Sequence, residues 1–499
     1  MIINISEISK DYDIVIVGAG ITGLALGRLL DSEKYKVLVI EAGNFKFNKK
    51  ANKNSYAKVN NIGNWPVQNY ASYHSRVRMF GGNANVWGGW CMELDEYDYN
   101  QNMVWNSLKN DLKLHYKKAY EILNINPKEI SKEKLNLKSV EPYVINVSRG
   151  NFISESKKYF ESNKNIDLLI ETKLTELNFE ENKVTSINIK NLKEEVSIVN
   201  LKQLIISTGG IETTKILLNN IPSQYQNPNL GKNFMEHPQL QVGRVTISNS
   251  SINKFIQTNS PPTAKHLFDD KLNIQKDKYF SGFKSTDPNI RNYFVLRTSD
   301  VYQSKTLYRL RHIILTRTLS STGKIKAKDI IELINDLANM FIKKIINSIT
   351  RSKSYSVVLH LEQKPSEVNQ IFIDNNNDIV LDWNFTDEDL KNLNDSIKDL
   401  NKIFHEMESK FDLKNIFNED EEEIINYLEK NIFGIGHHMG TTRIGLNKEG
   451  SVCDINLKHF DIDNLFINST SVFPSGGIAN PTLTMLALTS RLAEKLNNE

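Results

Sequence analysis

The chain has 499 residues, of which 39% are hydrophobic and 24% charged, a balance typical of a globular protein rather than a disordered or fibrous one. Its 62 Lys and Arg residues against 59 Asp and Glu leave a net charge of +3, which argues against a dedicated nucleic-acid-binding protein. Two cysteines, Cys91 and Cys453, are too few for a disulfide framework, a zinc site or a haem attachment, so we expect no metal site.

The N-terminal sequence MIINISEISKDYD has neither the basic nor the apolar region of a secretion signal. No stretch approaches the roughly 18 apolar residues that a membrane span requires. We therefore expect a cytoplasmic protein without a transmembrane segment.

Residues 13–43 predict a strand, a glycine turn, a helix and a second strand. Gly18, Gly20 and Gly23 form GxGxxG, in which the first glycine allows a tight turn, the second lets the backbone approach a pyrophosphate, and the third lets helix and strand pack closely. Glu41 ends the second strand, where an acidic side chain can bind both ribose hydroxyls. This motif by itself leaves FAD and NAD open.

Two further glycine-rich segments follow. RVRMFGGNANVWGGWCMEL (76–94) contains Gly81 and Gly82, and consecutive glycine N–H groups can form an anion-binding nest beside an extended cofactor. LIISTGGIETTKILL (204–218) predicts a second strand–glycine–helix element around Gly209.

Residues 325–349 have apolar side chains at helical spacing. We expect this helix to cover the protein's own core, with a membrane-surface or partner-binding face as the alternative. The stripe includes Ile330, Leu333, Leu337, Met340 and Phe341.

In chain order, these segments resemble the glucose–methanol–choline (GMC) family of FAD-dependent oxidoreductases over essentially the whole length. The matching motifs are GAGITG with Glu41, the GG…WGG loop, STGGIETTKILL, GKNFMEHP, HxxGT and ANPTLT. The loop around Trp87 and the tail SVFPSGG look most like the sugar-oxidising branch, near pyranose oxidases and gluconate- or fructose-type dehydrogenase large subunits.

The resemblance implies an α/β protein (α+β overall) with a Rossmann-type FAD-binding domain and an inserted mixed-sheet substrate domain. The FAD-binding domain is expected to be discontinuous and to comprise residues 1–60, 140–238 and 430–499, with loop 76–94 along the cofactor. Residues 61–139 and 239–429 are expected to form the substrate or cap domain.

The resemblance also implies that FAD is the cofactor. Relatives that bind FAD covalently carry a His in the loop that here reads ANVWGG, so we expect non-covalent binding. Many relatives have Asp where this chain has Ser469, which puts one polar contact to the cofactor in question. The residues expected to contact the cofactor are Gly18, Gly20, Gly23, Glu41, Gly81, Gly82, Asn85, Gly209, Ser469 and Pro481.

Oxidation of an alcohol requires a base that removes the hydroxyl proton, and His is suited to this role near neutral pH. The family's HxxGT spacing selects His437 rather than the adjacent His438, and its partner is Asn480, whose amide can both donate to and accept from the substrate oxygen. Pro481 should keep Asn480 extended and begin a helix over 482–496 whose positive N-terminal end faces the flavin.

Four other polar residues stand outside these assignments. His237 in MEHP is expected to be a structural turn residue. Arg443 could meet a phosphate or cap its loop. Glu362 and Gln363 could line the site or lie on a solvated loop.

The leading hypothesis is an FAD-dependent enzyme that oxidises a CH–OH group of a sugar or sugar-like alcohol, with proton removal by a histidine and hydride transfer to flavin. The alternatives are an FAD-holding lyase of the same fold and an NAD-dependent dehydrogenase. No haem or iron–sulfur motif is present, so the electron acceptor is open between oxygen, a quinone, a small carrier and a partner protein.

Overall fold

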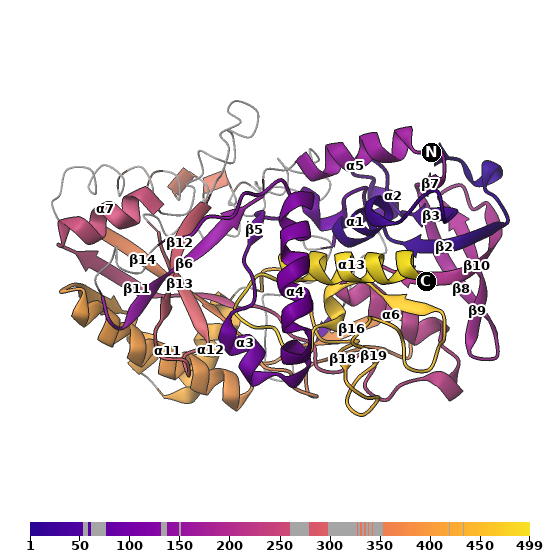
Figure 1. The fold of residues 1–499 in the computed structure, drawn as a ribbon. Helices are drawn as coiled ribbons and strands as arrows, with labels where there is room; N and C mark the ends of the chain where they lie inside the picture. Colours follow the sequence, from indigo (N-terminus) through magenta and orange to yellow (C-terminus); the bar gives the residue numbers. More distant parts are fainter. Residues whose placement is uncertain are drawn as a thin grey trace.

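The computed structural model describes residues 1–52, 58–60, 76–130, 137–148, 151–259, 279–297, 353–418, 420–432 and 434–499, together with positions 327, 330, 331, 334, 335, 338 and 342. Two large β-sheets occupy opposite ends of the molecule (Figure 1). Helices α4 (Met103–Ile122) and α13 (Pro481–Asn498) run through the middle and pack against each other.

The first sheet combines a parallel part with an antiparallel edge. Strands β1, β7, β3, β2, β10 and β20 pair in parallel, whereas β9 and β8 extend the sheet from β10 in antiparallel fashion. All four residues of VLVI in β3 are buried, as expected for a parallel strand covered on both faces. The bounds are β1 (Ile2–Ile3), β2 (Asp11–Val17), β3 (Val37–Ile40), β7 (Ile166–Leu169), β8 (Thr172–Glu180), β9 (Lys183–Asn191), β10 (Val196–Ile206) and β20 (Leu465–Ile467).

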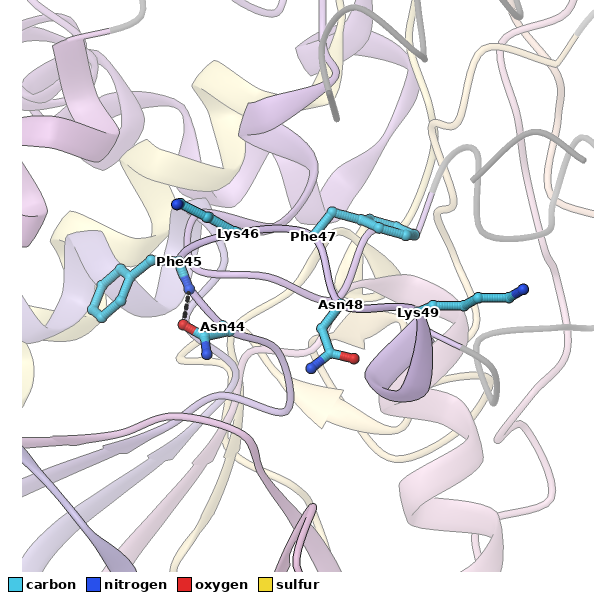
Figure 2. A pocket seen from close by; sticks show the side chains of 6 residues that line it. All are labelled: Asn44, Phe45, Lys46, Phe47, Asn48 and Lys49. Carbon is cyan, nitrogen blue, oxygen red and sulfur yellow. Dashed lines mark hydrogen bonds between the residues drawn. The ribbon is translucent and has the colours of Figure 1, made fainter. Parts of the chain in front are cut away.

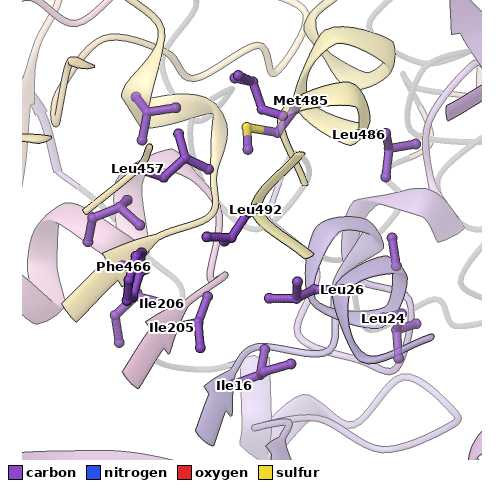
Figure 3. Packing of buried hydrophobic residues seen from close by; sticks show 14 of the residues in the cluster. Ile16, Leu24, Leu26, Ile205, Ile206, Leu457, Phe466, Met485, Leu486 and Leu492 are labelled. Carbon is purple, nitrogen blue, oxygen red and sulfur yellow. The ribbon is translucent and has the colours of Figure 1, made fainter. Parts of the chain in front are cut away.

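The core of this half is built from both ends of the chain. Helix α1 (Ile21–Leu29) follows β2 directly, and its Leu24 and Leu26 are buried. Met485 and Leu492 of α13 are buried in the same hydrophobic cluster, together with Ile16 of β2 (Figure 3). The C-terminal helix therefore completes a core that the first residues of the chain begin.

The second sheet has the order β17-β11-β14-β13-β12-β6-β5. The sequence predicted a mixed sheet here, but every pairing among its described strands is antiparallel. A short connection joins β12 to β13, which permits only an antiparallel pair. The bounds are β5 (Trp90–Cys91), β6 (Val140–Val147), β11 (Gln239–Ile247), β12 (Tyr279–Ser285), β13 (Asn292–Arg297), β14 (Lys353–Leu361) and β17 (Lys410–Leu413).

Helices α7, α11 and α12 lie at the end of the molecule that holds the second sheet (Figure 1). In α11 (Asp387–Glu406), Thr386 and Asp389 form a capping box at the N-terminus, and Leu393 and Leu400 of its apolar face are buried in the hydrophobic cluster of this sheet. The remaining elements are η1 (Ile5–Glu7), α2 (Lys49–Asn52), β4 (Lys58–Asn60), η3 (Gly82–Asn85), α3 (Glu96–Gln101), α5 (Asn151–Ser162), α6 (Gly210–Asn220), η5 (Ser223–Tyr225), α7 (Ser250–Asn259), β15 (Gln370–Ile373), β16 (Ile379–Asp382), η8 (Asn415–Asn418), α12 (Glu421–Asn431), β18 (Ile444–Gly445), β19 (Cys453–Asp454) and η9 (Thr470–Val472).

Strand β6 lies outside the domain to which its residues were assigned from the sequence. Strand β6 pairs with β12, for example Ile145 with Phe280, so it belongs to the second sheet. The sequence had placed it in the segment 140–238 of the FAD-binding domain. Its hydrogen-bonded neighbour β12 lies more than 130 residues away along the chain. The local sequence of β6 does not indicate this partner.

The expected core-covering helix at 325–349 is only partly described. Ile330, which we placed in its buried stripe, is 50% exposed, so this expectation is wrong for that residue. Ile334 and Ile342 lie one and three turns further along and are also exposed. Leu333, Leu337, Met340 and Phe341 lie outside the described residues. Of the helices in the described part of the chain, none combines the length and apolarity needed to cross a membrane.

Candidate active site

The glycine turn after β2 is constrained by packing at two of its three glycines. A Cβ on Gly18, whose φ is +104°, would lie 2.5 Å from the Ser207 carbonyl oxygen, and a Cβ on Gly23 would lie 1.9 Å from the Gly18 oxygen. At Gly20 the nearest atom to such a Cβ is 3.9 Å away. The fold therefore requires glycine at 18 and 23 but leaves room at 20, which fits the approach of a pyrophosphate to the bare backbone.

Glu41 is buried at the end of β3, beside this turn. Its carboxylate accepts hydrogen bonds from the Ala19 N–H (3.0 Å) and the Gly43 N–H (2.7 Å). Burial raises the pKa of Glu41 to about 7. An acidic group at this place fits the ribose of a dinucleotide, as the sequence predicted.

The loop expected along the cofactor does lie against the glycine turn. The Gly81 N–H donates to the Ala19 carbonyl at 2.8 Å, and a Cβ on Gly82 would lie 3.0 Å from the Gly20 Cα. The Asn85 amide nitrogen donates to the carbonyls of Phe80 (3.0 Å) and Gly82 (2.9 Å), so this side chain holds the loop in shape.

Two other expected cofactor contacts lie at helix beginnings. Gly209 caps α6 with a φ of +76°, and no atom lies within 4 Å of where its Cβ would be. Ser469 caps η9, and its buried hydroxyl lies 2.6 Å from the Ser471 hydroxyl. Its neighbour Asn468 accepts a hydrogen bond from Thr22 of α1, which ties this segment to the dinucleotide turn.

Asn480 has the backbone conformation that Pro481 was expected to impose. It is extended, with φ −60° and ψ 132°, and α13 begins at Pro481. The Asn480 side chain makes no capping bond to the helix, and its Oδ1 lies 3.5 Å from the Tyr293 hydroxyl. The amide is therefore available beside the positive end of α13.

His437 is partly buried and joined directly to a second histidine. Its Nδ1 lies 2.9 Å from the Nδ1 of His237, and its backbone N–H donates to the Glu236 carboxylate at 2.7 Å. Within the described residues its Nε2 makes no hydrogen bond. Burial holds the pKa of His437 well below its usual range, and the nearby His237, His438 and His360 act in the same direction.

The adjacent His438 faces another part of the structure. Its ring packs against Phe234 with centroids 5.9 Å apart, and its Nε2 lies 4.0 Å from a Glu236 oxygen. The Thr470 hydroxyl donates to its carbonyl at 2.7 Å. Burial lowers the pKa of His438 to about 3, so its imidazole is neutral near pH 7.

Several side chains that gather here were assigned no functional role from the sequence. His237 was expected to be a structural turn residue, yet its ring bonds to that of His437. The His360 ring stacks on Tyr293 with centroids 4.2 Å apart, and its Nδ1 accepts a 2.8 Å hydrogen bond from the Gln239 side-chain amide nitrogen. Tyr293 in β13 and His360 in β14 lie on strands that are almost entirely buried, so their sequence pattern does not distinguish a site from a core.

Glu362 and Gln363 do not lie on a solvated loop, because both are buried. One Glu362 oxygen lies 2.6 Å from Arg291 Nε, and the other accepts the Gly477 N–H at 2.9 Å. Arg291 also forms an ion pair with Asp98. This charged group supports the segment that leads to Asn480.

Gln363 and Arg443 hold backbone and side-chain groups around the site. The Gln363 side-chain oxygen Oε1 accepts hydrogen bonds from the Trp383 indole N–H at 2.6 Å and from the Glu236 backbone N–H at 3.2 Å. Arg443 donates to the Gly450 carbonyl at 3.0 Å, which is the loop-capping alternative.

An open hollow of about 580 Å³ follows Glu41 and Gly43 along the chain (Figure 2). It is formed by consecutive residues, and the Phe45 N–H donates to the Asn44 side chain at 2.6 Å. None of the expected catalytic residues lines it. The lining residues are Asn44, Phe45, Lys46, Phe47, Asn48 and Lys49.

Comparison with known proteins gives two family matches. Residues 365–489 match the C-terminal domain model described as GMC oxidoreductase, and residues 16–46 match a model described as an NAD(P)-binding Rossmann-like domain. A C-glycoside 3-oxidase of Arthrobacter globiformis is 39% identical over 64 residues, which cover 13% of this chain and only 12% of that protein.

Solved structures match over nearly the full length. Pyridoxine 4-oxidase from Mesorbium loti has a TM-score of 0.62 at 15% identity, and an FAD-dependent oxidoreductase from Chaetomium thermophilum has 0.58 at 16%. Each match covers 98% of this chain and 99% of the other. The predicted α/β fold with a Rossmann-type domain is thereby confirmed. Residues 365–489 are thus similar to the C-terminal domain of GMC oxidoreductases, and the glycine turn is similar to that of NAD(P)-binding Rossmann-like domains.

Proposed function

We propose that this protein is an FAD-dependent oxidoreductase that oxidises a CH–OH group of a sugar or sugar-like alcohol. The proposal is supported by a series of neighbouring side chains between His437 and Asn480. Tyr293 lies beside Asn480 and stacks on His360, whose charge would act on His437. A Cβ on Gly476, four residues before Asn480, would lie 3.3 Å from the His237 ring that bonds to His437.

The cofactor-binding residues fit FAD bound along the first sheet. Gly18, Gly20, Gly23 and Glu41 would hold its nucleotide end. Non-covalent binding is supported by the sequence ANVWGG, which contains no histidine. The residues proposed to contact the remainder of FAD are Gly81, Gly82, Asn85, Gly209, Ser469 and Pro481. When bound, the flavin supplies the acceptor for the hydride that leaves the carbinol carbon.

In this proposal His437 is the general base. Its lowered pKa keeps the imidazole neutral near pH 7, so a ring nitrogen can accept the hydroxyl proton. The Asn480 amide can donate to the substrate oxygen and does not compete for that proton. His438 is too buried and too tightly packed against Phe234 for this role.

A hydroxyl-rich substrate is supported by the polar and aromatic groups around Asn480. His360 Nε2, Gln239 Oε1 and the Tyr143 hydroxyl are buried without a hydrogen-bond partner among the described residues. Buried polar groups of this kind need partners, which sugar hydroxyls can supply. The match to a C-glycoside 3-oxidase and the tail SVFPSGG also favour the sugar-oxidising branch.

The proposed location is the cytoplasm, in keeping with the two free, buried cysteines. We also retain the proposed division into an FAD-binding part (1–60, 140–238 and 430–499, without β6) and a substrate part (61–139 and 239–429).

The test is anaerobic mixing of the purified protein with sugars, polyols and pyridoxine while the flavin absorbance is followed. Bleaching of the flavin by a sugar or polyol supports the proposal. Bleaching by pyridoxine alone would show that the substrate is a pyridoxine-like alcohol and not a sugar or polyol. A yellow protein that no alcohol bleaches would favour the lyase, whereas a colourless protein that oxidises alcohols with NAD would favour the NAD-dependent dehydrogenase. Repeating the mixing with oxygen or a quinone identifies the electron acceptor.

A further inference from the structure

Two histidine rings from distant parts of the chain form one hydrogen bond. The Nδ1 atoms of His237 and His437 are 2.9 Å apart, and the ring planes are nearly perpendicular at 86°. Burial lowers the pKa of His237 to about 4 and that of His437 well below its usual range, so both rings are neutral near pH 7. A hydrogen bond between two neutral imidazoles holds one proton, so the tautomer of one ring fixes that of the other.

The position of the proton on His237 decides which ring donates. The other nitrogen of His237, Nε2, is buried and lies next to Gly476, where a Cβ would be 3.3 Å away. When the proton is on Nε2, His237 presents the lone pair of Nδ1 to His437 across the 2.9 Å contact.

The consequence for His437 follows directly. If His237 Nδ1 is the acceptor, His437 must donate from Nδ1 and keep the lone pair on Nε2, the nitrogen without a hydrogen bond in the described structure. We propose that His237 is a positioning residue that holds His437 in the Nδ1–H tautomer, so that Nε2 can accept the substrate proton. This inference rests on the proposed function, because it gives His437 the role of base.

The other tautomer would be inactive as a base toward the substrate, because Nε2 would carry a hydrogen atom. A hydrogen bond of ordinary net strength shifts a tautomer equilibrium by about tenfold. Loss of the His237 acceptor should therefore slow proton removal by at most about tenfold without removing His437 itself.

The test compares His237→Asn with His237→Gln in the flavin-containing protein. Asn places an amide oxygen close to the former Nδ1 position and can accept the His437 proton, whereas the longer Gln places its oxygen close to the former Nε2 position. The two side chains are equally polar, so a general effect of losing the ring should appear in both. His405→Asn, at an exposed position of α11, is the control for labelling and assignment.

The direct readout is ¹⁵N NMR of histidine-labelled protein without substrate, with the His437 signals assigned by their loss in His437→Ala. The wild type and His237→Asn should show a protonated Nδ1 and an unprotonated Nε2 on His437. His237→Gln should shift the population toward Nε2–H. A wild-type His437 protonated on Nε2, or a Gln variant with an unchanged tautomer, would overturn the inference.

Rapid-mixing kinetics then connect the tautomer to the reaction. With a substrate that bleaches the flavin, His237→Gln should reduce the limiting rate by up to about tenfold at an unchanged substrate dissociation constant, and His237→Asn should restore most of it. Equal rates in the two variants would contradict the positioning role. If the NMR tautomers are as expected but no alcohol bleaches the flavin, the proposed function fails and the assignment of the proton stands.

Discussion

The side-chain carboxylate of Glu236 holds the backbone of His437 in place. One carboxylate oxygen of Glu236 accepts the His437 N–H at 2.7 Å and the His237 N–H at 2.9 Å, and the other accepts the Gly436 N–H at 2.9 Å. The two paired imidazoles are therefore attached to backbone segments that share one buried acceptor. Their separation is set by the fold and does not depend on side-chain packing alone.

Replacement of Glu236 should lower stability in proportion to the hydrogen bonds lost. Glu236→Ala leaves the buried His237 N–H and the partly buried Gly436 and His437 N–H groups without an acceptor, at about 1–3 kcal/mol for each one that stays unsatisfied. Glu236→Gln keeps one oxygen for the two histidine N–H groups and should cost less. Denaturant unfolding measures both free energies, and equal losses in the two variants would contradict the shared-acceptor role.

The same carboxyl should make stability depend on pH. Burial raises the pKa of Glu236 from 4.5 to about 7, so the folded protein retains a proton that the unfolded chain releases. The resulting stabilisation is complete below pH 4.5 and is lost as the pH rises through 7. The difference in unfolding free energy between wild type and Glu236→Gln should therefore decline across this interval. A constant difference would show that the carboxyl does not titrate there.

His437→Ala should leave flavin bound and slow its reduction by about 10²–10⁴-fold, the usual contribution of a positioned general base. His405→Ala, at an exposed position of α11, should have no effect. His438→Ala should lower stability more than rate, because that ring is packed against Phe234. Anaerobic rapid mixing of each variant gives the rates. A larger rate loss in His438→Ala than in His437→Ala would reverse the assignment of the base.

The rate of flavin reduction should persist into mildly acidic solution. The pKa of His437 lies well below 6.5 because the ring is buried, so the unprotonated base remains populated when the pH falls through 6.5. The limiting rate should decline only at lower pH. A wild-type profile that falls with a midpoint near 6.5 would indicate a base exposed to water.

Tyr293→Phe should affect the rate through Asn480. The Tyr293 hydroxyl lies 3.5 Å from Asn480 Oδ1, a long contact, so its loss should slow reduction by less than about tenfold. Asn480→Ala should cost more, because it removes the amide that orients the substrate. Double-mutant kinetics provide the check: the Tyr293→Phe effect should shrink when Asn480 is already Ala.

Gly20→Ala should weaken FAD binding while leaving the flavin-free fold nearly unchanged. A Cβ there meets no atom closer than 3.9 Å, and the stability cost should stay below about 1 kcal/mol. Gly23→Ala is the contrasting variant, because its Cβ would lie 1.9 Å from the Gly18 oxygen and must disturb the turn. Flavin content after purification and thermal unfolding distinguish the two effects. Flavin still attached to the chain after acid denaturation would disprove non-covalent binding.

The local parts of the site could be predicted from sequence alone. Gly18, Gly23 and Pro481 act through their own backbone geometry and that of their immediate neighbours, so their effects are readable in a short segment. Met485 and Leu492 of α13 are likewise at helical spacing, a pattern that indicates a buried face, and both are buried.

The non-local parts were missed for a physical reason. The bond between His237 and His437 joins residues 200 positions apart, and either residue alone has the pattern of an ordinary turn or loop histidine. Strand β6 was assigned to the wrong sheet because its partner β12 lies beyond a long intervening segment. A single sequence states which side chains are present but not which distant backbone segments become neighbours.

The ion pairs of Arg291 also bear on the order in which the protein folds. They join Asp98 to Arg291 across 193 positions and Arg291 to Glu362 across 71, and Glu362 then reaches Gly477 across a further 115. Closing loops of this length is slow compared with forming a strand–turn–helix unit. The segment that leads to Asn480 should therefore dock late in folding, after the loops that bring Asp98, Arg291, Glu362 and Gly477 together have closed.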